Sequence, residues 1–235
     1  MFILSIDTAT KSLAVSIIKY NLNLANDINK KYNTYLEKKN NKLSLDILKD
    51  YVNLLTDVDT LLENKMIIYH LDVIDLIPNK KILDTSIQER TKSLYDYLNN
   101  TIDPLIELYS INNKTEEWII LLENQMSPNK NSNIINSQLI YHFSKYPYPI
   151  TLVGPTLKNK IIIGGKESEY SSFLESHNTN YAANKSHSRS CLLKLLKYLK
   201  KENILDKYNI KKKNVDDIAD SVLQGLSFVI KYKSF

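Results

Sequence analysis

Carboxylate side chains occur in three short segments that lie far apart in this 235-residue chain. Asp7 follows an apolar run at the N-terminus, Glu123 ends an apolar run near the middle, and three aspartates fall within residues 216–220. A buried carboxylate is costly unless it is paired or bound to a metal ion. Taken singly, Asp7 could be a turn residue and Glu123 a charged residue at a strand end. The prediction of a metal site therefore depends on the three segments occurring together. We expect these groups to gather around divalent cations.

The chemistry expected of such a site is the hydrolysis or transfer of phosphate esters with the help of two metal ions. One ion activates the attacking water and the other stabilises the leaving oxygen, at a separation of roughly 3.5–4 Å. Hard cations such as Mg²⁺ prefer oxygen ligands, so Asp and Glu are the residue types that the chemistry requires. Rigid strands and helices have to supply the geometry.

The C-terminal acidic segment carries the most specific pattern. Apolar residues recur at helical spacing from Val215 onward, which predicts an amphipathic helix over residues 215–232. Asp217 and Asp220 are three apart and are neighbours on that helix, and Asp216 is a neighbour of Asp220 as well. The helix dipole stabilises acids in a first turn, but three carboxylates in five residues indicate a compensating cation. Asp216 is an alternative to Asp217 as a ligand.

Alternating or continuous apolar runs predict five strands, at residues 2–7, 12–19, 66–77, 117–123 and 150–153. The first two are expected to form a hairpin, and the fourth a central strand covered on both faces. Helical spacing predicts helices at residues 86–110 (interrupted by Pro104), 132–146, 186–203 and 215–232. The order of elements indicates a mixed α/β fold. We expect one domain over residues 1–235, with a partly helical insertion at about 21–62.

Composition narrows the function classes. With one cysteine the chain forms no intrachain disulfide, which fits a reducing compartment. We therefore expect an intracellular protein. No apolar stretch approaches the roughly 18 residues of a membrane span, so we expect no membrane partner. Abundant Asn, Lys, Ile and Tyr are typical of an A+T-rich genome, and they weaken any inference from an isolated lysine or tyrosine.

Positive charge is concentrated between Lys185 and Lys213. Ten basic and two acidic residues there give a net charge of +8, against +5 for the whole chain. A basic stretch beside an acidic metal site is the balance that a nucleic-acid enzyme needs. His187, within the stretch, is expected at the surface. Four basic residues are predicted to bind DNA phosphates: Lys185, Arg189, Lys194 and Lys197.

Three segments resemble the motifs of RuvC-type Holliday junction resolvases, and most closely those of poxviruses and other large DNA viruses. They are Ile-Asp-Thr at 6–8, Leu-Leu-Glu-Asn-Gln at 121–125 and Asp-Asp-Ile-Ala-Asp-Ser at 216–221. The basic segment lies where that family has a basic, DNA-contacting helix. The resemblance implies four catalytic and metal-binding residues: Asp7, Glu123, Asp217 and Asp220.

The same resemblance implies a ribonuclease H-like fold, with a mixed five-stranded sheet, one antiparallel strand and helices on both faces. It implies a homodimer that resolves four-way or branched DNA junctions by paired nicks. Two Mg²⁺ ions per active site, replaceable by Mn²⁺, are the implied cofactors. In a virus, such an enzyme would act in recombination and replication, in the host cytoplasm.

Three other functions fit parts of the sequence. Residues 2–17 resemble the start of TsaB-type proteins, which are binding modules related to actin-like ATPases. However, the four glycines of the chain form no G-x-G pattern for cradling phosphates. A non-catalytic protein that binds DNA through residues 185–213 is a second alternative. Another nuclease with a ribonuclease H-like fold is a third, because fold and metal site do not identify the substrate.

Overall fold

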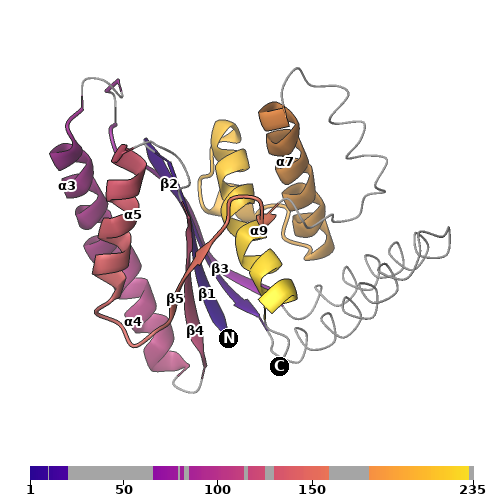
Figure 1. Cartoon of the computed structure of the whole chain (residues 1–235). Helices are drawn as coiled ribbons and strands as arrows, with labels where there is room; N and C mark the ends of the chain where they lie inside the picture. Colours follow the sequence, from indigo (N-terminus) through magenta and orange to yellow (C-terminus); the bar gives the residue numbers. More distant parts are fainter. Residues whose placement is uncertain are drawn as a thin grey trace, which may run out of the picture.

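A mixed five-stranded sheet forms the centre of the computed structural model, and helices cover both of its faces (Figure 1). The strands are β1 (Phe2–Thr8), β2 (Ser12–Tyr20), β3 (Met66–Asp75), β4 (Trp118–Glu123) and β5 (Ile150–Val153), in the order β3-β2-β1-β4-β5. β2 runs antiparallel to β1 and β3, whereas β1, β4 and β5 are parallel. The predicted mixed five-stranded sheet, with one antiparallel strand and helices on both faces, is confirmed.

The structure describes residues 1–9, 11–20, 66–78, 80–81, 85–113, 116–124, 130–158 and 180–232. The predicted insertion at 21–62 lies outside these residues. The helices are α3 (Ile87–Tyr97), α4 (Asp103–Asn112), α5 (Lys130–Phe143), α7 (Asn180–Tyr198), α8 (Ile204–Lys207) and α9 (Val215–Tyr232). Among the helices of the described ranges, none has the length and apolar character of a membrane span.

The predicted helix at 86–110 is divided into two. A π-helical turn, η2 (Leu98–Ile102), joins α3 to α4 just before Pro104. Proline has no backbone N–H and its ring crowds the preceding turn, so the wider π-helical turn accommodates it at the beginning of α4. The predicted interruption is therefore confirmed, and the chain continues in nearly the same direction through it (Figure 1).

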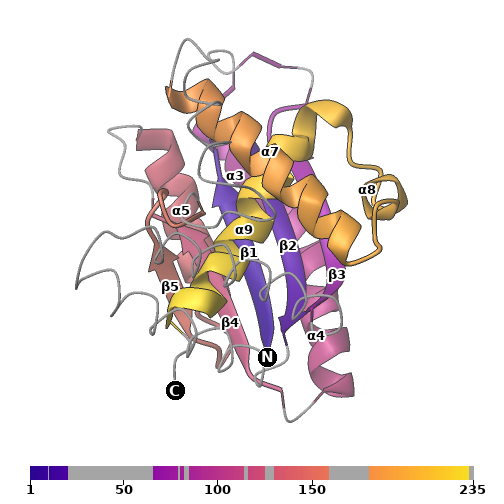
Figure 2. The same cartoon turned by 90° about the vertical axis from the view of Figure 1, so that its right-hand side faces the viewer.

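Helices bury both faces of the sheet, which explains why β1 and β4 are apolar almost throughout. Successive side chains of a strand point to opposite faces. Phe2, Leu4 and Ile6 pack in the core beneath α3, α4 and α5, whereas Ile3 packs in the core beneath α7 and α9. Figure 2 shows α9 across β1 and β2, with α7 lying over it.

Candidate active site

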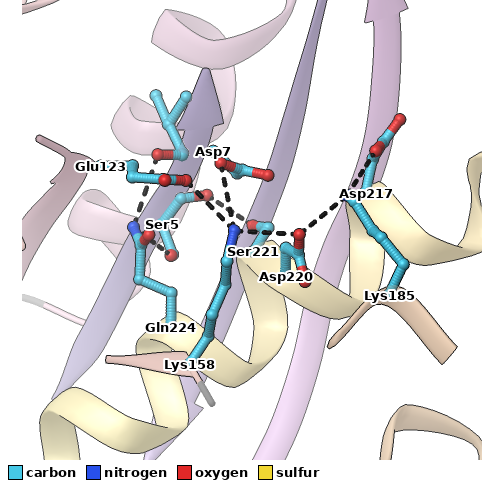
Figure 3. Close-up of polar contacts among 10 residues, drawn as sticks. Ser5, Asp7, Glu123, Lys158, Lys185, Asp217, Asp220, Ser221 and Gln224 are labelled. Carbon is cyan, nitrogen blue, oxygen red and sulfur yellow. Dashed lines mark hydrogen bonds and ion pairs between the residues drawn. The ribbon is translucent and has the colours of Figure 1, made fainter. Parts of the chain in front are cut away.

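Strand register places Asp7 and Glu123 side by side. The parallel pairing of β1 with β4 sets Ile6 opposite Leu122, so the two acidic residues come next on neighbouring strands. Asp7 shares the face of Ile3, which packs beneath α9. Both carboxylates therefore lie at the carboxyl end of the sheet, on the face that α9 covers (Figure 3).

α9 brings a third carboxylate to this point. The helix spans Val215–Tyr232, as predicted from its apolar spacing. Asp220 is 3% exposed, which is exceptional for an aspartate, whereas Asp217 lies one turn earlier and is partly exposed. The residues of α9 that pack against the sheet are buried: Ile218, Ala219, Val222, Leu223 and Leu226.

The three carboxylates converge on the ammonium group of Lys158 (Figure 3). Lys158 Nζ lies 2.9 Å from Asp220 Oδ2, 3.3 Å from Glu123 Oε2 and 3.7 Å from Asp7 Oδ1. The sequence did not predict this residue. It lies three residues after Val153-Gly154-Pro155, which resembles the end of the fifth strand in junction resolvases, and a single lysine in a lysine-rich chain gives no signal.

A second lysine connects this group to Asp217. Lys185 Nζ lies 2.8 Å from Asp220 Oδ2 and 3.1 Å from Asp217 Oδ1. Asp216 is held apart by Arg189, whose Nε lies 2.6 Å from Asp216 Oδ1. Two lysines thus join all four predicted carboxylates into one cluster, and Asp216 lies outside it.

Burial and charge shift pKa values within the cluster. Burial and a hydrogen bond with the Glu123 carboxyl raise the pKa of Asp7 well above its ordinary value, although the charge of Lys158 opposes this. Burial alone would lower the pKa of Lys158, but the charges of Asp7, Asp220 and Glu123 outweigh burial and raise it. Asp220 likewise raises the pKa of Lys185 against the effect of burial. Both lysines are therefore protonated at neutral pH, and their two positive charges are fewer than the four carboxylates around them.

The donor set fits divalent cations in type and charge. If every group is ionised, the four carboxylates and two lysines leave two negative charges, and all the side-chain donors are the oxygens that hard cations prefer. In the part of the chain that the structure describes, no three acidic, histidine or cysteine side chains form a ready-made metal-binding group. Instead, Lys158 occupies the centre of the carboxylates, so a cation would compete with it for the same oxygens.

Buried hydrogen bonds fix α9 on the sheet beside the carboxylates. Ser221 Oγ donates to Ser5 O at 2.8 Å and lies 2.8 Å from Ser16 Oγ. Gln224 Nε2 donates to Ser5 Oγ at 3.1 Å. Sliding α9 along β1 would leave these buried groups without partners. The network therefore holds the residue before Ser221, which is Asp220, at a fixed height above the sheet.

The four basic residues predicted to contact DNA have different surroundings on α7. Lys185 and Arg189 face α9 and are paired with its carboxylates. Lys197 is exposed and Lys194 is half-buried. Phosphate binding by these residues stays a prediction.

The expectation that His187 lies at the surface is wrong. The side chain is 4% exposed, and its Nε2 lies 3.5 Å from the Sγ of buried Cys191. His187, Cys191 and Leu195 recur every four residues, so they share the side of α7 that is buried. The many basic residues of the stretch concealed this buried stripe.

No family model matches the chain, and no curated protein sequence shows significant similarity to it. Its structure is similar to that of fowlpox virus resolvase in complex with Holliday junction DNA, with 19% identity, a TM-score of 0.48 and coverage of 97% of both chains. RuvC of Thermus thermophilus is 10% identical, with a TM-score of 0.46 over 99% of this chain and 97% of that one. The structure of T. thermophilus RuvC in complex with a Holliday junction substrate also has 10% identity and a TM-score of 0.46, over 99% of this chain and 98% of that one. At these values, similarity alone assigns no activity.

Proposed function

We propose that this chain is a metal-dependent endonuclease that resolves four-way and branched DNA junctions. The observation that supports it best is the convergence of Asp7, Glu123 and Asp220, from two strands and a helix, on one buried point. Acidic groups gathered in this way are stable only with cations close by. The resemblance of the three motifs to those of junction resolvases supplies the substrate class.

In this proposal Asp7, Glu123 and Asp220 hold the ions, which are Mg²⁺ or Mn²⁺, two per site. Bound ions would polarise the scissile phosphate and lower the pKa of the attacking water. The protein contributes rigid placement, because the ends of β1 and β4 are fixed by their pairing and α9 by its buried hydrogen bonds.

Asp217, rather than Asp216, is proposed as the fourth carboxylate of the site. Lys185 joins Asp217 directly to Asp220, whereas Arg189 holds Asp216 away from them. Asp217 is the more exposed member of the pair on α9, which suits a ligand at the entrance of the site.

Lys158 is proposed to stabilise charge on the phosphate. Its raised pKa keeps it protonated at neutral pH, so it cannot serve as a general base. A fixed ammonium group at the reacting centre instead stabilises the negative charge that develops during cleavage. Without substrate or metal, the same ammonium compensates the buried carboxylates.

Resolution of a junction needs two nicks, in opposed strands, and the cluster described above is a single site. We therefore propose that the protein acts as a homodimer in which each subunit makes one nick. On the resemblance, we place this activity in the recombination and replication of a large DNA virus. Sedimentation that shows only monomer, with and without junction DNA, would count against the dimer.

The test is incubation with a labelled four-way junction, a matched duplex and an RNA–DNA hybrid, with and without Mg²⁺. We expect paired nicks in the junction alone, and only with the metal ion. Glu123→Gln should abolish cleavage but retain junction binding. Glu107→Gln makes the same change at an exposed position of α4 on the opposite face, and it should cleave like the wild type.

The other outcomes separate the alternatives. Preferred cleavage of the hybrid would indicate another nuclease with this fold. Binding without cleavage under every condition would indicate a non-catalytic DNA-binding protein. Neither binding nor cleavage would contradict the proposal and favour a binding module of the TsaB type.

A further inference from the structure

A polar hollow of about 390 Å³ lies beside the carboxylate cluster. It is formed by the turn between β1 and β2, the end of β3 and the segment that precedes α9. Its volume falls within the roughly 300–1,000 Å³ of small-ligand sites. Of its lining residues, Lys11, Asp75, Asn209, Lys211 and Lys213 carry charged or amide side chains. The side chain of Asp72, which also contributes to the lining, interacts with Tyr97 on the opposite face of the sheet.

Backbone hydrogen bonds fix the walls of this hollow. Leu76 N donates to Lys11 O at 2.8 Å, which ties the β1–β2 turn to the end of β3. Tyr208 Oη donates to Tyr69 O at 2.6 Å, which ties the opposite wall to the same strand. Asn214 N donates to Lys211 O at 2.8 Å within the turn before α9. The hollow is therefore formed before any ligand arrives, which lowers the entropic cost of binding.

Positive charge is available in the lining. Asp75 is already engaged, with Oδ1 accepting from Ile77 N at 3.0 Å and Oδ2 lying 3.7 Å from Lys11 Nζ. Lys211 and Lys213 are exposed, and neither forms an ion pair with a residue that the structure describes. Both lysines are thus available for an anion, in contrast to Lys185 and Arg189 of α7.

The hollow and the carboxylate cluster occupy the same end of the sheet. Ser12, which lines the hollow, begins β2 opposite Asp75, the last residue of β3. Asp7 lies next to the last residue of β1, so the cluster and the hollow are separated by about two strand spacings, or roughly 10 Å. α9 links them directly, because Lys213 and Asn214 precede its acidic first turn. A DNA strand cut at the cluster could reach both places.

We infer that this hollow binds a backbone phosphate of the DNA strand being cut, beside the scissile one, through Lys211 and Lys213. The inference rests on the proposed nuclease function and adds to it the path of the substrate strand. Asn209 and Asn214 offer amide donors beside the two lysines. Asp75 limits the affinity, since its carboxylate faces the same space.

Binding of a labelled four-way junction, measured over a series of salt concentrations without divalent ions, tests the inference. Removing one lysine that neutralises a phosphate should make the slope of log K against log salt shallower by about 0.9. We expect Lys211→Gln/Lys213→Gln to change the slope by about twice that, roughly 1.8, and each single variant by half of it. Lys92→Gln removes one charge from an exposed position of α3 on the opposite face and should keep the wild-type slope.

Asp75→Asn provides a second readout with the opposite sign. Its side-chain oxygen can still accept from Ile77 N, so the local fold is retained while a negative charge is removed. We expect tighter junction binding than in the wild type.

Wild-type slope in the double variant, together with unchanged affinity in Asp75→Asn, would overturn the inference even if the wild type cleaves junctions. Conversely, a shallower slope in a protein that binds DNA but never cleaves it would support the hollow and refute the nuclease. If the wild type binds no DNA, both proposals fail.

Discussion

Two clusters of charged side chains, on opposite faces of the sheet, differ in their balance of donors and acceptors. On the face of α4 and α5, the single carboxylate of Asp103 has three partners. His142 Nε2 lies 2.9 Å from it, Lys145 Nζ 2.5 Å and Tyr146 Oη 2.8 Å. Burial would raise the pKa of Asp103, but the hydrogen bonds from Lys145, His142 and Tyr146 outweigh it and lower the pKa.

At the carboxyl end of the sheet the balance is reversed. Asp7, Glu123 and Asp220 share the ammonium of Lys158, and the pKa of Asp7 is raised. A carboxylate that accepts hydrogen bonds from several donors, as Asp103 does, stabilises the folded protein. The carboxylates of the other cluster outnumber their two lysine partners, Lys158 and Lys185, so holding them together has a stability cost that a bound cation would relieve. The difference supports the proposal that the cluster at the carboxyl end of the sheet is the active site.

The largest expected effect separates the clusters by activity. Asp220→Asn removes a proposed metal ligand and should lower junction cleavage by roughly 1,000-fold or more, because the metal contributes several kcal/mol and about 1.4 kcal/mol is a factor of ten. Asp103→Asn makes the same change on the other face and should leave the cleavage rate of the folded protein near that of the wild type. Similar losses in both variants, under conditions where both are folded, would erase the distinction.

Lys158→Gln should reduce cleavage by about 100-fold, the scale for loss of one group that stabilises transition-state charge. The same variant sharpens the comparison by a second measurement. Since Lys158 and a cation compete for the same carboxylates, Mg²⁺ should raise the melting temperature of Lys158→Gln more than that of the wild type. An equal or smaller increase would show that the ammonium and the ion do not compete.

Stability should respond with opposite signs in the two clusters. Asp103→Asn weakens charged hydrogen bonds and should cost about 2 kcal/mol in urea unfolding. In the absence of divalent ions, Asp7→Asn removes an acid whose ionisation is disfavoured and should stabilise the protein. Each kcal/mol gained should raise the melting temperature by about 2–4 °C. Asp96→Asn, at an exposed position of α3, should stay within about 0.5 kcal/mol of the wild type. Destabilisation by Asp7→Asn would contradict the account.

The pH dependence follows from the same two carboxylates. The folded-state pKa of Asp103 is below the ordinary value of 3.8, so its contribution is present above that value and lost as the pH falls through the folded pKa. The folded-state pKa of Asp7 is above 3.8, so its contribution declines as the pH rises from that value through the raised pKa. We therefore expect the free energy of unfolding, measured in EDTA over a range of pH, to depend less on pH in each variant. The dependence should weaken in the acid range for Asp103→Asn and toward neutral pH for Asp7→Asn.

The smallest expected effect concerns the placement of α9. Ser221→Ala leaves Ser5 O without its buried donor and should cost about 1–2 kcal/mol. Cleavage should fall only modestly, with a higher Mg²⁺ concentration needed for half-maximal rate, because Asp220 is less firmly held. Ser227→Ala removes a buried serine hydroxyl further along α9 and should leave the Mg²⁺ requirement unchanged.

Much of this arrangement could be predicted from periodicity. The five strands, the position of β4 in the interior of the sheet and the span of α9 follow from apolar spacing. The parity of β1 and β4 directs Asp7 and Glu123 to one face. Lys158 could not be predicted, because its position depends on the chain path after β5 and lysine is common in this sequence. The pairing of Lys185 and Arg189 with aspartates was also hidden, since a basic stretch does not reveal which of its residues face another helix.

Binding of Mn²⁺ to the DNA-free protein, followed by electron paramagnetic resonance, is the decisive measurement of whether the carboxylates at the end of the sheet bind a cation. We expect the wild type and Asp103→Asn to bind the ion, and Asp220→Asn to lose it or bind it at least tenfold more weakly, by about 1.4 kcal/mol. Equal binding by Asp220→Asn and the wild type, or none by the wild type, would contradict the claim that the carboxylates at the end of the sheet form a cation site.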